Sequence, residues 1–203
     1  MYYLHELHEQ FQLFNVFKYI TFRAASAAIL SFLLCVIFGG RVIRGLTALK
    51  LGQPIRTPQE VRELSKLHES KGGTPTMGGV LLLGAVLVSA ILFSRPTNPF
   101  IQVMVVVLVG LGTLGFVDDY LKVKQKNSKG ISARVKLAAQ AGIATAVGLF
   151  LVLRPETSVY IRELHVPFYK HALIQDMGWF AIPFFVIVIV GCSNAVNLTD
   201  GLD

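Results

Sequence analysis

The sequence predicts an all-α protein that crosses a membrane about five times, and two observations support that prediction. The first is composition: 53% of the 203 residues are hydrophobic and only 15% are charged, whereas a soluble domain usually carries about 25% charged residues. The second is the separation of the charges, which leaves five long uncharged stretches. Such stretches cross a bilayer as helices, because lipid offers the backbone no hydrogen-bonding partner.

The uncharged stretches contain 17, 23, 22, 17 and 23 residues, and they are Ala24–Gly40, Gly72–Ser94, Pro96–Val117, Leu137–Leu153 and Met177–Thr199. A hydrocarbon core about 30 Å thick requires roughly 17–25 such residues for one helical span. A soluble bundle is disfavoured, because five fully buried helices would leave too little chain to cover them. We therefore expect one transmembrane domain over residues 1–203.

The distribution of lysine and arginine predicts the orientation. Alternate sides of the membrane hold 13 and 6 of the 19 basic residues, and the richer side contains the loops Arg41–Lys71 and Lys122–Lys136. The positive-inside rule places that side in the cytoplasm and the N-terminus outside. The net charge of +7 is explained by these loops, which attract anionic membrane lipids, and we expect no nucleic-acid partner.

Two loops carry their own structural signals. Thr57-Pro58-Gln59-Glu60 is a capping box with proline at the first helical position, so a short amphipathic helix to about Ser70 is expected along the cytoplasmic interface. In the external loop, Val159–Arg162 and His165–Phe168 are rich in β-prone residues, which favours a small β-hairpin there.

Three polar clusters fall on the cytoplasmic side. In the first, Lys71–Gly79, Thr74 is expected to cap the second spanning helix. Two interpretations of this cluster are equally favoured: the helix N-terminus binds a phosphate group, or the glycines allow close packing of helices. The second is Asp118-Asp119, where the alternatives are an i,i+4 ion pair of Asp118 with Lys122 or neutralisation by a divalent cation. The third, Asn194–Asp203, places four polar residues at the end of a span, an expensive arrangement that indicates function.

These clusters together resemble the phospho-N-acetylmuramoyl-pentapeptide-transferase family, and the strings concerned are Gly73–Gly79, Gly115–Tyr120 and Asn194–Asp203, with Asn15–Phe17 and Thr21–Arg23 before the first span. The family has about ten spanning helices. The resemblance therefore implies that this chain is a first half, that the main metal ligand lies beyond Asp203, and that residues 1–203 alone are inactive.

The resemblance implies transfer of phospho-MurNAc-pentapeptide from UDP-MurNAc-pentapeptide to undecaprenyl phosphate in the bacterial inner membrane, giving lipid I and UMP. Magnesium is the expected cofactor, and the resemblance allows a homodimer. Asp118 and Asp119 are the expected catalytic residues, with Asp118 accepting or orienting the lipid phosphate proton. The expected substrate-binding residues are Lys71, Thr74, Thr76, Lys122, Asn194, Asn197, Asp200 and Asp203.

Three alternatives stay open. The sister branch of the same family attaches N-acetylglucosamine 1-phosphate to a polyprenyl phosphate. A secondary transporter also contains intramembrane carboxylates and broken helices, but its polar residues lie near mid-bilayer. A non-catalytic fragment is the third.

Overall fold

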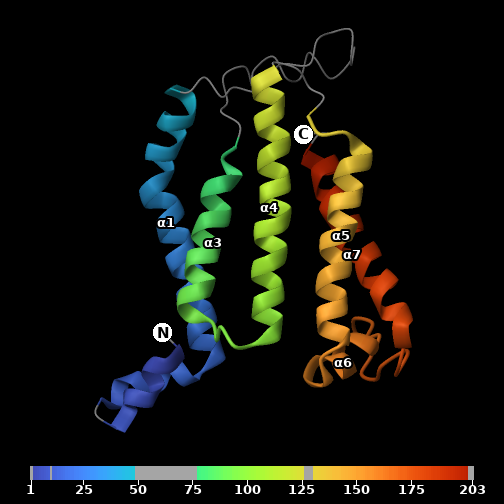
Figure 1. The fold of residues 1–203 in the computed structure, drawn as a ribbon. Helices are drawn as coiled ribbons and strands as arrows, with labels where there is room; N and C mark the ends of the chain where they lie inside the picture. The colour runs from blue at the N-terminus through green and yellow to red at the C-terminus, as the bar shows by residue number, and fades with distance from the viewer. Residues whose placement is uncertain (1, 10, 49–76, 126–129, 201–203) are drawn as a thin grey trace. The chain divides into compact units, whose positions relative to one another are not determined.

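A computed structural model describes residues 2–9, 11–48, 77–125 and 130–200 of the chain. These residues form helices and contain no β-strand beyond a single isolated bridge. The helices, shown in Figure 1, are η1 Tyr2–Glu9, η2 Gln12–Lys18, α1 Ile20–Ala48, α3 Gly79–Phe93, α4 Pro99–Gln125, α5 Ala133–Val152, α6 Pro155–Arg162, η4 Gly178–Phe180 and α7 Ala181–Asp200.

Four of these helical segments are long and apolar enough to cross a membrane: Ile20–Ala48, Pro99–Gln125, Ala133–Val152 and Gly178–Val196. The shorter apolar helix α3 has 15 residues. Large apolar side chains on the spans face outward; Ile29, Phe32 and Val36 of α1, for example, are 60%, 67% and 61% exposed. Lipid, and not water, is the solvent that such surfaces match, so the predicted multi-pass helical architecture is confirmed.

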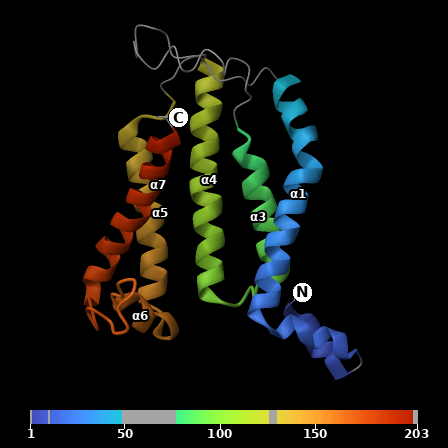
Figure 2. The same ribbon diagram turned by 180° about the vertical axis from the view of Figure 1, so that it is seen from behind.

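The described residues divide into two compact units, and the division falls within α4 between Leu111 and Gly112. The first unit contains η1, η2, α1, α3 and the C-terminal part of α4. In it, α1 and α3 pack along each other (Figure 2). A Cβ at Gly112 would lie 2.7 Å from Leu83 Cδ1, so glycine allows α4 to approach α3 closely, as small residues do between membrane helices.

The second unit contains the N-terminal part of α4 together with α5, α6, η4 and α7. Its centre is the packing of α5 against α7, where Ala144, Val147 and Leu151 of α5 are at most 4% exposed. A Cβ at Gly148 would lie 3.3 Å from the Phe185 ring, which again shows that a small residue sets the helix separation.

Two of the local predictions were wrong. The expected hairpin in the external loop is absent: Val159–Arg162 belongs to α6, and only an isolated bridge joins Leu164 to Ile174. Pro155 at the first helical position and Glu156 in the first turn favour a helix start more strongly than the β-branched residues favour a strand.

The second spanning helix also starts later than expected. Its N-cap is Gly78 and not Thr74, and Met77 has a left-handed φ of 72° that no α-helix can include. The predicted interface helix between Thr57 and Ser70 lies outside the described residues.

Candidate functional site

The two adjacent aspartates lie on α4, seven and six residues before the helix ends at Gln125. The helix continues beyond them, which brings Lys122 within reach of both. Lys122 Nζ lies 2.7 Å from Asp118 Oδ2 and 3.3 Å from Asp119 Oδ1. The i,i+4 ion pair that the sequence allowed is therefore formed, and one ammonium serves two carboxylates.

The two carboxylates differ in their surroundings. The Asp118 side chain is only 11% exposed, and its second oxygen accepts a hydrogen bond of 2.8 Å from the backbone N–H of Ile131. The Asp119 side chain is 43% exposed. Asp118 is thus fixed from two directions, whereas Asp119 is directed toward the surroundings, where a ligand can reach it.

A turn at Gly130 makes the contact with Asp118 possible. Gly130 has a left-handed φ of +50°, and a Cβ there would collide with Asp118 Oδ1 and lie 2.9 Å from Lys122 Cε. Only glycine combines this backbone conformation with so close an approach to the carboxylate. Neither Gly130 nor Ile131 was predicted from the sequence as part of the site, since no local pattern indicates which carboxylate a turn will meet.

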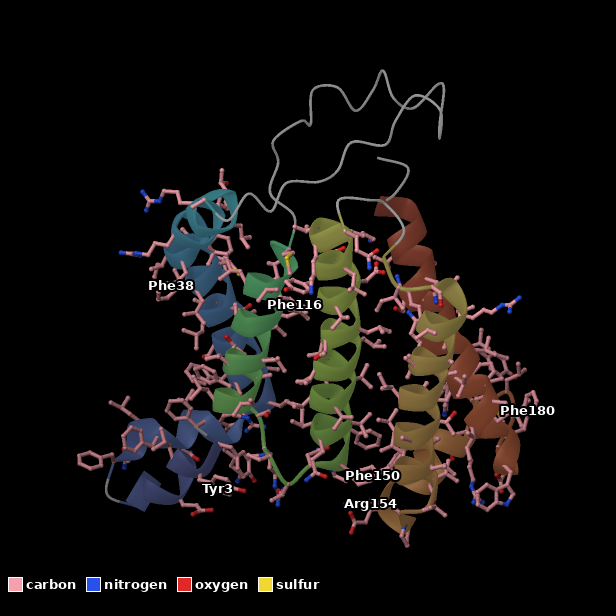
Figure 3. The ribbon with its side chains drawn as sticks, turned by 45° about the horizontal axis from the view of Figure 1, so that its top comes forward. Tyr3, Phe38, Phe116, Phe150, Arg154 and Phe180 are labelled. Carbon is pink, nitrogen blue, oxygen red and sulfur yellow. The ribbon has the colours of Figure 1, made fainter. Side chains whose placement is uncertain are left out.

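Next to the aspartates, Phe116 and Tyr120 stack on the surface of α4 with their ring planes 7° apart and their centroids 6.3 Å apart. Figure 3 shows the labelled Phe116 on this helix. The rings are 44% and 46% exposed. Together with Asp119 they give this side of α4 an apolar and an anionic part.

The trio of Asp118, Asp119 and Lys122 carries a formal charge of −1, which suits a divalent cation or a cationic complex. Among the residues that the structure describes, no group of three or more His, Cys, Asp or Glu side chains could hold a metal ion. Of the two carboxylates, Asp119 is the more accessible to a metal ion, because its side chain is 43% exposed and that of Asp118 is 11% exposed.

The third predicted cluster begins in a polar contact between α5 and α7, within the second unit. Gln140 is 1% exposed; its Nε2 donates to Ser193 Oγ at 3.1 Å, and its Oε1 accepts from Asn194 Nδ2 at 2.7 Å. Asn194 Nδ2 also donates to the Val190 carbonyl at 2.8 Å. The two amide hydrogens of Asn194 are therefore used inside the protein, and its oxygen is the group left for a ligand.

Sequence reasoning missed Gln140 and Ser193. The signal for Gln140 was an amide-bearing side chain within the uncharged stretch Leu137–Leu153, where a polar group needs a partner.

The other predicted site residues are less fully placed. Asn197 and Asp200 belong to the last turns of α7. Lys71, Thr74, Thr76 and Asp203 lie outside the described residues.

Comparison with known proteins places these features in a family. The sequence profile of glycosyl transferase family 4 matches residues 101–203. The chain is 50% identical over 203 residues to the phospho-N-acetylmuramoyl-pentapeptide-transferase of Methylacidiphilum infernorum (isolate V4), covering 100% of this chain and 56% of the relative. It is 48% identical over 200 residues to the protein of the same name from Geobacter sp. (strain M21), covering 98% and 53%. The chain thus spans about half the length of the curated relatives it matches.

Proposed function

Because the chain belongs to glycosyl transferase family 4, we propose that it forms the first half of an enzyme that transfers phospho-MurNAc-pentapeptide from UDP-MurNAc-pentapeptide to undecaprenyl phosphate. The products are lipid I and UMP, and the setting is the bacterial plasma membrane with the site facing the cytoplasm. The observation that carries the proposal is identity of about one half along the whole chain to relatives named for this transferase.

The geometry on α4 supports different roles for Asp118 and Asp119. Phosphoryl transfer depends mainly on positioning and on neutralising charge. Asp118, held by Lys122 and by the Ile131 N–H, orients the lysine and the turn. Asp119 is exposed beside them and meets the phosphate-bearing substrates.

Charge neutralisation requires cations near the transferred group. Lys122 supplies one, and its 31% exposed side chain remains accessible to an incoming phosphate. Magnesium, when bound, would neutralise charge on the pyrophosphate, and Asp119 would contribute one of its oxygen ligands. Within the second unit, Asn194 maintains the contact of α7 with α5 through its hydrogen bond to Gln140.

The proposal is tested by transfer assays on the full-length protein in detergent with magnesium. We expect turnover of UDP-MurNAc-pentapeptide far faster than of UDP-N-acetylglucosamine. A reversed preference would assign the protein to the sister branch. Uptake of a solute into liposomes without formation of a lipid-linked product would favour the transporter alternative.

Single substitutions test the roles on α4. Asp119→Asn should lower kcat about 10²-fold or more, as loss of one positioned charge at a reacting centre does. Lys122→Met should also lower activity strongly, whereas Lys124→Met, which removes the same charge from an exposed position two residues along α4, should be nearly neutral. Equal losses for the two lysines would show that net charge, and not the ion-paired geometry, matters.

A further inference from the structure

The segment before the first span folds into two short helices, η1 and η2, that contact each other and extend obliquely outward from the Ile20 end of α1 and beyond it (Figures 1 and 2). A single residue, Tyr19, separates η2 from α1. Large apolar side chains along this segment are turned outward: Phe11, Leu13 and Ile20 are 60%, 87% and 72% exposed. Water alone would be a poor solvent for this surface.

Arg23 marks the depth of this region in the membrane. It is the last charge before the uncharged stretch Ala24–Gly40, and a guanidinium at such a boundary lies at the level of the lipid head groups. Arg23 Nη1 donates hydrogen bonds to the carbonyls of Phe17 at 2.7 Å and Lys18 at 2.8 Å. The end of η2 is therefore held at head-group depth.

The beginning of η1 is held at the same depth. The Tyr2 ring contacts two guanidiniums, with Arg23 Cζ 4.8 Å and Arg95 Cζ 5.2 Å from its centroid. Arg95 is the one charge between the second and third uncharged stretches, so it also marks a membrane boundary. Both ends of the segment are therefore tied to arginines that lie at a membrane boundary.

A row of aromatic rings joins the segment to the span. Phe11 contacts Phe14, Phe14 contacts Phe17, and Phe17 contacts Phe22 of α1, with ring centroids 5.6, 6.3 and 5.4 Å apart. Rigid aromatic side chains of this kind are enriched where a protein meets the boundary between head groups and acyl chains. The row is thus continuous with the lipid-facing surface of α1.

From these contacts we infer that residues 2–9 and 11–20 form an interfacial anchor that lies in the lipid head-group layer at the Ile20 end of α1, with Leu13 and its apolar neighbours in contact with acyl chains. The occupant of this exposed surface is the lipid itself. Arg23 and Arg95 set the depth of the anchor, and the row of rings gives it stiffness. Such a surface helix binds through its buried apolar area.

The test is spin labelling of the full-length protein in phospholipid vesicles, with a single cysteine at Leu13 and all native cysteines replaced. Collisions of the label with oxygen, which concentrates in lipid, are compared with collisions with a water-soluble nickel complex. A label at Ile29, exposed near the middle of α1, provides the lipid reference, and free label in buffer provides the aqueous one. The Leu13 label should give an oxygen-to-nickel ratio between these two, several-fold above the free label.

Two results would overturn the inference. A ratio equal to that of the free label would place Leu13 in water. A strongly immobilised label shielded from both probes would mean that another part of the protein covers this surface. Arg23→Lys keeps the charge but removes the forked contact with the η2 carbonyls, so it should shift the Leu13 label toward the aqueous value, while an Ile29 label in the same variant stays unchanged.

Discussion

Replacing Gly130 by alanine tests whether the turn and Asp118 stabilise each other. At φ +50° an L-residue is strained, and the new Cβ would collide with Asp118 Oδ1 and approach Lys122 Cε to 2.9 Å. The turn must then move away, and the 2.8 Å hydrogen bond from the Ile131 N–H to Asp118 is lost or lengthened.

The expected cost has two parts. A left-handed conformation costs an L-residue about 1–2 kcal/mol, and loss of a hydrogen bond to a charged group costs about 1.5–3 kcal/mol. Gly178 separates the two, because it has a φ of +54° but nothing within 4 Å of a built Cβ. Gly178→Ala should therefore show the conformational cost alone, and Gly130→Ala should exceed it by about 1.5–3 kcal/mol.

The free energy of unfolding of each variant is measured by titration with sodium dodecyl sulfate in mixed micelles. A double-mutant cycle identifies the source of any difference. In an Asp118→Ala background the carboxylate is absent, so Gly130→Ala should cost no more than Gly178→Ala. Equal costs for the two glycine variants in the native background would refute the reasoning, since the contact with Asp118 would then contribute nothing.

Two further predictions follow from the fold. Gln140→Leu should lower the free energy of unfolding by about 1 kcal/mol, since a hydrogen bond between membrane helices contributes about 0.6 kcal/mol on average. A double-mutant cycle of Gln140→Leu with Asn194→Leu should show a coupling energy of that order. If the effects of the two substitutions were strictly additive, the contact between the two side chains would be contradicted. Single cysteines at Ser128 and Tyr160 should react with impermeant reagents from opposite sides of the membrane, and labelling of both from one side would invalidate the predicted orientation.

The spanning helices were predictable because membrane solvent imposes a simple rule on the sequence. Charges such as Arg23 and Arg41 interrupt apolar stretches at intervals set by bilayer thickness. Each of the helices α1, α3, α4, α5 and α7 covers most of one predicted stretch. The ion pair of Asp118 with Lys122 was predictable for a similar reason, since i,i+4 neighbours on a helix depend on local geometry alone.

The remaining features depend on tertiary packing or on competition between local signals. The pairing of Gln140 with Asn194 joins residues 54 positions apart, and no sequence spacing specifies which faces of two membrane helices meet. Thr74 and Pro75 predicted an earlier start for α3, but the left-handed conformation of Met77 is incompatible with an α-helix, and α3 begins at Gly79. In α6, the helix-start signal of Pro155 competes with the β-branched residues that follow it, and the helix forms.

The hydrogen bonds of Asn194 have a consequence for the whole end of α7. A helix advances 100° and about 1.5 Å per residue, so fixing the azimuth of position 194 also fixes the azimuths of positions 197 and 200, up to about 9 Å further along the axis. Inserting or deleting one residue between 194 and 200 would rotate the later positions by 100° relative to α5 without altering any side chain. This stretch of α7 should therefore tolerate a substitution at Val196, which is 62% exposed, but should not tolerate the insertion or deletion of a residue.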